Sequence, residues 1–130
     1  MKMIEIKTKL NEIAQNNYFV EFDGGEEDVL LHLSDYPYFN VSKFTKKEYN
    51  KLLKIIDITH KSTKDYQIYF WYDVSGYEYW IDNDDTNYIA CSIYIKNQNL
   101  KNFDKLYSDI IATIEKLNNK LIKYNIQFFY

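Results

Sequence analysis

The chain of 130 residues contains no arginine, and it has only one cysteine, one proline and three glycines. Without arginine, the forked guanidinium contacts that read carboxylates, phosphates or guanine edges are excluded. Any anion site must therefore use lysine or backbone amides. The single Cys91 cannot form an internal disulfide, and this fits a reducing compartment.

Long apolar runs are absent as well. No run approaches the roughly 18 apolar residues that a membrane-spanning helix needs, and residues 1–10 lack the apolar core of a signal peptide. The sequence therefore predicts a soluble protein that stays in the cytoplasm and has no membrane contact.

Catalytic motifs are missing too. The sequence has no glycine-rich phosphate loop, no G-x-S-x-G and no H-E-x-x-H. His32 and His60 lack metal-ligand spacing to each other or to Cys91. Cys91 stands among isoleucines, a setting typical of a buried, inert thiol rather than a nucleophile. We therefore predict no enzyme activity, no catalytic residue, no cofactor and no metal site.

The acidic stretch 82–87 is the nearest approach to a metal motif. It begins like a calcium loop, with Asp82 and Asp84 at the first and third positions. The sixth position is Asn87 instead of glycine, and the twelfth is Ile93 instead of glutamate. An ordinary acidic turn is therefore the favoured interpretation.

Aromatic and charged residues are plentiful, and the charges are segregated. The chain has 14 tyrosines, 8 phenylalanines and 2 tryptophans. Residues 21–42 and 65–95 each carry six carboxylates and no lysine, whereas residues 43–64 carry a net charge of +5. Such a separation can steer a partner toward one face of the molecule. The lysines of 43–64 avoid the apolar stripe, and we interpret them as the solvated face of a helix.

The hydrophobic periodicity predicts one α+β domain spanning residues 1–130. Apolar residues at three- and four-residue spacing predict helices at about 3–16, 45–60 and 102–124. Alternating patterns predict strands at about 18–23, 29–33, 66–74, 77–82 and 87–96. The order αββαβββα favours a single antiparallel sheet of about five strands with helices packed on one face. The apolar residues of 126–130 are expected to dock on the sheet.

The register of the central hairpin gives the main functional hypothesis. If Ser75 and Gly76 form a two-residue turn, paired positions sum to 151. Phe70 and Tyr72 then face the core, together with the isoleucines of the strand at 87–96. On the opposite face, Tyr69 pairs with Asp82, Trp71 with Trp80, and Asp73 with Glu78. Tyr88 and Tyr94 extend this face.

This opposite face is unusual for a solvated surface. Like charges directly opposite on paired strands are destabilising, and two adjacent tryptophans present a large apolar area to water. A binding surface explains both features, because tryptophan and tyrosine dominate interface hot spots. The alternative is that a helix or the C-terminal tail covers this face as a second core layer. The predicted partner-binding residues are Tyr69, Trp71, Asp73, Glu78, Trp80, Asp82, Asp84, Asp85, Tyr88 and Tyr94.

These features predict a non-catalytic, protein-binding inhibitor. Its acidic aromatic face would dock on the basic surface of a nucleic-acid-processing enzyme, without direct contact to nucleic acid. In size, acidity and lack of catalytic motifs, the chain resembles phage-encoded anti-defence inhibitors such as anti-CRISPR proteins, and immunity proteins that neutralise toxin nucleases. Two alternatives remain open: a protein that binds or sequesters a nucleotide or glycan on the Trp/Tyr face, and self-association into a homo-oligomer.

Overall fold

The computed structural model describes residues 3–14, 19–21, 30–33, 37–40, 43–73 and 86–128. Its helices are α1 (Met3–Ile13), α2 (Lys46–Ile58) and α4 (Phe103–Leu121), and a 3-10 turn, η2 (Ile122–Tyr124), continues α4. Its strands are β1 (Phe19–Glu21), β2 (Leu30–Leu33), β3 (Tyr38–Asn40), β4 (Lys61–Ser62), β5 (Tyr66–Asp73) and β6 (Thr86–Ile95). All of these strands join one antiparallel sheet in the order β1-β2-β6-β5-β4, and β3 pairs with β6.

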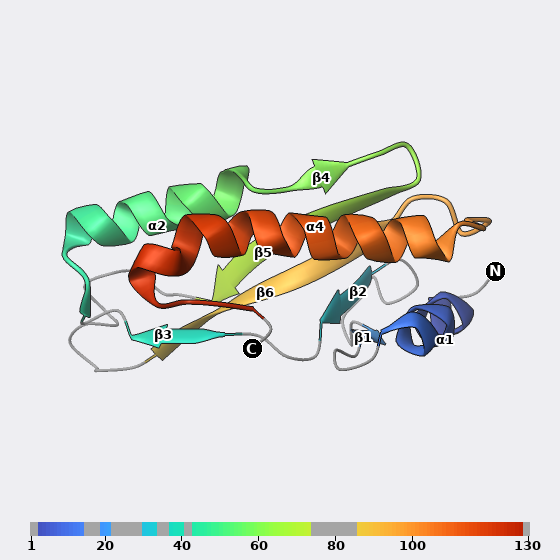
Figure 1. Cartoon of the computed structure of the whole chain (residues 1–130), viewed down its shortest axis with the longest axis horizontal. Coiled ribbons are helices and arrows are strands. Elements are labelled where there is room, and N and C mark those ends of the chain that lie inside the picture. Colours follow the sequence, from blue (N-terminus) through green and yellow to red (C-terminus); the bar gives the residue numbers. More distant parts are fainter. Residues whose placement is uncertain are drawn as a thin grey trace.

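The helices lie on one face of the sheet, as predicted. Figure 1 shows α2 and α4 side by side across this face and running in opposite directions, with α1 beside β1. The buried apolar side chains of the helices and strands, apart from Ala90, form one cluster. Within the described part of the chain, no helix is both long and apolar enough to cross a bilayer.

Helix α2 begins with a capping box formed by Thr45 and Glu48. The Thr45 hydroxyl accepts a hydrogen bond from the Glu48 backbone N–H at 3.2 Å, and the Glu48 carboxylate accepts one from the Thr45 N–H at 3.0 Å. The bond from the Thr45 backbone lowers the pKa of Glu48. Two otherwise unpaired helix donors are satisfied in this way. The helix then buries Tyr49, Leu52 and Ile56 against the sheet.

Strands β5 and β6 form the centre of the sheet. They pair directly along their length, from Tyr66 opposite Ile95 to Asp73 opposite Tyr88. Because side chains alternate between the two faces of a strand, every second residue meets the helices. The buried residues on this covered face are Tyr66, Ile68, Phe70, Ile89, Cys91, Ile93 and Ile95. This assignment of faces confirms the prediction from the sequence.

The C-terminal segment docks on the same covered face. The Phe128 side chain is 1% exposed, and its ring centroid lies 5.6 Å from that of Phe70. The side-chain amide of Asn118 in α4 makes two hydrogen bonds to the Phe128 backbone. It donates to the Phe128 carbonyl and accepts from the Phe128 N–H, each at 2.8 Å. The predicted docking is confirmed for residues 126–128, and they lie on the helix side of the sheet.

Two short strands were not predicted. The sequence pattern assigned residues 38–40 to no strand, but Tyr38–Asn40 forms β3. Strand β4 pairs with the start of β5 through a turn in which the Thr63 hydroxyl accepts from the N–H groups of Asp65 and Tyr66, each at 3.2 Å. Strands this short contain too few residues to show alternation. The predicted strand 77–82 and its turn at 75–76 lie outside the described residues.

Candidate functional site on the open face of the sheet

The sheet face opposite the helices, here called the open face, carries four of the ten predicted site residues. Tyr69 and Trp71 from β5, and Tyr88 and Tyr94 from β6, alternate with the buried core residues, and each is partly exposed. None of the described helices covers this face, and neither do residues 126–128 (Figure 1). The alternative of a second core layer is therefore not realised by the described part of the chain.

Trp71 is held in a fixed orientation. Its indole Nε1 donates a hydrogen bond to the Ser92 hydroxyl at 2.7 Å. Trp71 lies directly opposite Ala90 in the strand register, and Ala90 and Ser92 are both small and buried. The indole therefore leans across β6, and its orientation is defined by a bond as well as by packing.

Trp71 begins a row of three rings that crosses three strands. The Trp71 and Tyr88 centroids are 5.8 Å apart at an interplanar angle of 70°, and those of Tyr88 and Tyr38 are 5.8 Å apart at 65°. Edge-to-face contacts of this kind are favoured between aromatic rings. Tyr38 is 61% exposed, and the rings of Trp71, Tyr88 and Tyr38 are here called the aromatic row. Sequence reasoning missed Tyr38, whose only signal was the brief alternation around the buried Phe39.

A small hollow, here called the Trp71 hollow, lies beside the aromatic row. It measures about 140 Å³ and is lined by His32, Leu33, Trp71, Tyr88 and Ala90. It lies between the part of β6 that pairs with β2 and the part that pairs with β3. His32 is the last β2 residue that pairs with β6. Small-molecule sites usually measure about 300–1,000 Å³. The Trp71 hollow is therefore smaller than a nucleotide site.

The predicted acidic rim falls largely outside the described residues. Glu78, Trp80, Asp82, Asp84 and Asp85 all lie in the segment 74–85, which the structure does not describe. The backbone of residue 73 is described, and it lies opposite Tyr88. The pairing of Trp71 with Trp80 and the negative rim therefore remain predictions.

Collisional quenching of fluorescence tests the negative rim. In a Trp80→Phe variant, Trp71 is the remaining tryptophan. We expect caesium to quench its emission more strongly than iodide, relative to N-acetyltryptophanamide, because nearby carboxylates concentrate cations and repel anions. The difference should shrink as salt is added, because added ions screen the field. Equal normalised quenching by the two ions at low salt would show that no such rim surrounds Trp71.

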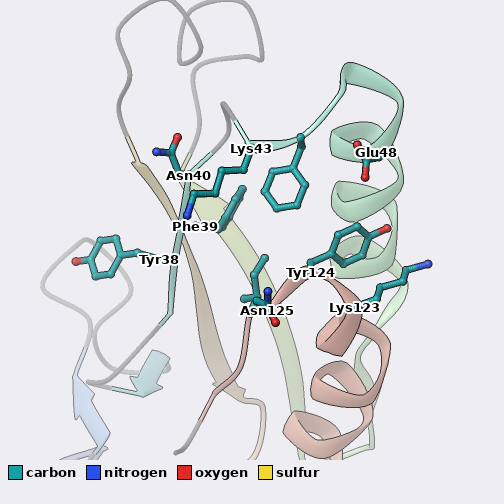
Figure 2. A pocket seen from close by; sticks show the side chains of 10 residues that line it. Tyr38, Phe39, Asn40, Lys43, Glu48, Lys123, Tyr124 and Asn125 are labelled. Carbon is teal, nitrogen blue, oxygen red and sulfur yellow. The ribbon is translucent and has the colours of Figure 1, made fainter.

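A second hollow, of about 340 Å³, lies between β3, the start of α2 and η2. Figure 2 shows the Lys43 side chain reaching toward Asn40 and Phe39, while the Lys123 amine points away from them. The Phe44 ring makes edge contacts with Phe39 and Tyr124, at centroid distances of 6.1 and 5.7 Å. This hollow, here called the Phe44 hollow, reaches the lower limit of small-molecule sites.

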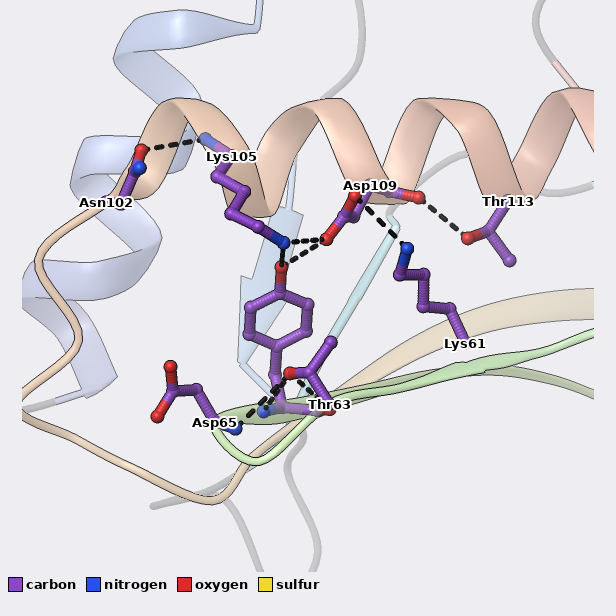
Figure 3. Close-up of polar contacts among 8 residues, drawn as sticks. Lys61, Thr63, Asp65, Asn102, Lys105, Asp109 and Thr113 are labelled. Atoms are coloured by element: carbon purple, nitrogen blue, oxygen red, sulfur yellow. Dashed lines mark hydrogen bonds and ion pairs between the residues drawn. The ribbon is translucent and has the colours of Figure 1, made fainter.

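A polar cluster joins α4 to β4 and β5 (Figure 3). The Tyr66 hydroxyl donates to the Asp109 carboxylate, which also accepts from Lys105 Nζ at 2.9 Å and lies 3.7 Å from Lys61 Nζ. Burial alone would raise the pKa of Asp109, but the hydrogen bonds from Tyr66 and Lys105 outweigh it and lower that pKa. Burial and the bond to Asp109 raise the pKa of Tyr66. We assign this cluster a structural role, because its groups satisfy one another.

The other candidates from the sequence have plain structural explanations. Cys91 is fully buried, and burial raises the pKa of its thiol to about 12, so the thiol stays protonated at neutral pH. The α2 lysines are exposed, as predicted: Lys46, Lys47, Lys51 and Lys54. Within the described ranges, no group of three or more His, Cys, Asp or Glu residues is arranged to hold a metal ion.

Comparisons with known proteins add no relative. A scan of protein-family models, a search of curated proteins and a search of solved structures each found no match to this chain.

Proposed function

We propose that this chain is a non-catalytic, protein-binding inhibitor whose open face docks on a basic surface of a nucleic-acid-processing enzyme. It would act in the cytoplasm, as an anti-defence or toxin-immunity protein, without contacting nucleic acid directly. The supporting observation is the aromatic row of Trp71, Tyr88 and Tyr38 on the face away from the helices. Tryptophan and tyrosine are among the residues that most often dominate binding energy at protein interfaces.

The charge of the chain supports a basic target. The net charge is −3, and residues 65–95, which supply all of β5 and β6, contain six carboxylates and no lysine. Enzymes that process nucleic acids carry lysine- and arginine-rich surfaces, because these must attract phosphate. Complementary charge of this kind speeds association and selects among partners.

Capture of the target tests this proposal. The tagged wild-type protein should retain a binding protein from host lysate, and Trp71→Ala should retain at least about tenfold less of it, because hot-spot truncation commonly costs this much affinity or more. Ile58→Ala is the matched control, since Ile58 is exposed at the end of α2, away from the open face. Circular dichroism must first show that both variants are folded.

The purified target then allows a sharper measurement. The association rate with wild type should fall steeply as ionic strength rises, because electrostatic steering is screened. If Trp71→Ala captures the same protein in the same amount as wild type, the open face is not the docking site and the proposal is wrong.

A small-ligand function is the second candidate, and the Phe44 hollow is the observation that favours it. The Trp71 hollow, at about 140 Å³, is too small for a nucleotide, whereas the Phe44 hollow measures about 340 Å³ and has aromatic walls. Such a function would therefore depend on Phe44 and Tyr124, and it would survive Trp71→Ala. This difference separates it from docking through the open face.

A further inference from the structure

We infer that the Trp71 hollow is a cage for one cationic side chain, a lysine or arginine that the protein partner presents. The inference rests on the proposed function and adds the chemistry of the anchoring contact. The described residues that line this hollow are His32, Leu33, Trp71, Tyr88 and Ala90.

The two large rings of the hollow form a corner. The Trp71 and Tyr88 planes meet at 70° with their centroids 5.8 Å apart, so they make two nearly perpendicular walls. A cation within about 6 Å of a ring centroid is attracted by the negative charge over the ring face, most strongly for tryptophan. The corner lets one cation contact both rings.

The size of the hollow matches a single side chain. Its volume is about 140 Å³. A protein cavity of about 150 Å³ is large enough to hold benzene, whereas drug-sized ligands need about 300 Å³ or more. The end group of one lysine or arginine therefore fits, and a nucleotide does not.

The cage is already formed before binding. The 2.7 Å hydrogen bond from Trp71 Nε1 to the Ser92 hydroxyl sets the orientation of the indole. Ala90, opposite Trp71 in the register, lines the hollow with only a methyl group. Binding therefore costs little ordering of side chains, and this raises the affinity for an incoming group.

The acidic composition of the sequence that supplies β5 and β6 favours a cationic guest. None of the described residues that line the hollow is a lysine, and Trp71, Tyr88 and Ala90 belong to residues 65–95, which carry six carboxylates and no lysine. Lys96, the residue that follows β6, donates to the Ser62 hydroxyl and the Thr63 carbonyl at 3.1 and 3.0 Å. It is therefore held beside β4, at the opposite end of β6 from Tyr88.

The test uses three small probes: the methylamides of Nα-acetyl-lysine, Nα-acetyl-arginine and Nα-acetyl-norleucine. Norleucine has the same carbon chain as lysine and lacks the ammonium. The lysine or the arginine probe should shift the Trp71 indole N–H resonance and bind at least about fivefold more tightly than the norleucine probe, within the range of a cation–π contact. Equal affinity for the charged and uncharged probes would overturn the inference.

Variants locate the binding. Ala90→Leu fills the hollow and should abolish binding of the charged probes, whereas Ala112→Leu, on the exposed side of α4, should leave it unchanged. If Ala90→Leu does not fold, Tyr88→Ile removes one wall of the cage and should weaken binding by at least about threefold. Wild-type affinity in a folded Ala90→Leu or Tyr88→Ile variant would contradict the cage.

The same variants separate the cage from the proposed function. If the target is lost with Trp71→Ala but still binds Ala90→Leu or Tyr88→Ile normally, the open face is the docking site and the cage is wrong. If Trp71→Ala also binds the target normally, the proposed function itself fails.

Discussion

Replacing Phe128 by alanine is expected to lower the free energy of unfolding by about 3–5 kcal/mol, the range for removing a buried phenylalanine. Phe128 is 1% exposed and packs on Phe70 at the centre of the sheet. Its removal leaves a cavity that the neighbouring side chains cannot fill. Because the Asn118 amide makes two hydrogen bonds to the Phe128 backbone, the C-terminal segment cannot easily shift to close this cavity.

Urea denaturation followed by far-UV circular dichroism measures this effect. The urea concentration at the unfolding midpoint should fall. The slope of the free energy of unfolding against urea concentration should stay unchanged, because unfolding exposes nearly the same surface in both proteins. Ile122→Ala is the control: Ile122 is 74% exposed, only six residues away, and its truncation should change stability by less than about 0.5 kcal/mol. If Phe128→Ala behaves like Ile122→Ala, the segment does not belong to the core.

Replacing Asp109 by asparagine is expected to cost about 2 kcal/mol at pH 7. The Asp109 side chain is 16% exposed, and it accepts hydrogen bonds from Tyr66 and Lys105. Hydrogen bonds to a charged group contribute about 1.5–3 kcal/mol each, and a weaker acceptor for the buried tyrosine loses part of that. The free energy of unfolding from urea titrations provides the measurement.

The stability that Asp109 contributes should change with pH in a defined direction. The pKa of Asp109 is lowered from 3.8 on folding, so the unfolded chain binds the proton first as the pH falls. The stability that Asp109 contributes is therefore present above about pH 4 and is lost at lower pH, as the folded pKa is crossed. The difference between wild type and Asp109→Asn should shrink below pH 4.

At alkaline pH, the stability of the fold depends on the protonation of Tyr66. Its pKa is raised from 10.0 on folding, so the unfolded chain loses that proton first and stability should fall above about pH 10. Asp104→Asn is the control for Asp109→Asn, because Asp104 is an exposed residue of α4, the helix that also carries Asp109. Its replacement should change the free energy of unfolding very little at pH 7. A cost for Asp109→Asn that stayed constant between pH 7 and pH 2 would contradict the assigned ion contacts.

Local features of the fold were predictable because their signals lie within a few residues. The start of α2 follows from Thr45 and Glu48, whose reciprocal hydrogen bonds span three residues. The two faces of β5 follow from its alternation, which separates Phe70 from Trp71. Each of these features depends on the covalent geometry of one turn or one pleat, which the sequence expresses directly.

Several features that join distant segments were not predictable. The cluster around Asp109 connects residues 43 positions apart, from Tyr66 to Asp109, and no spacing rule announces it. Tyr38 enters the aromatic row because β3 pairs with the first residues of β6, and three residues carry too weak a pattern to show this. The hollow beside Trp71 likewise exists only because β2 and β3 leave a gap along β6.

The sequence by itself determined the types of most elements, the sides of the central strands and the segregation of charge. It left open whether Trp71 faces a helix, the tail or no described element, since either face of an alternating strand can be covered. Only the tertiary structure decided this, by placing α2, α4 and Phe128 together on the Phe70 side. The physical reason is that periodicity is local, whereas the choice of covered face depends on how the whole chain buries its apolar area.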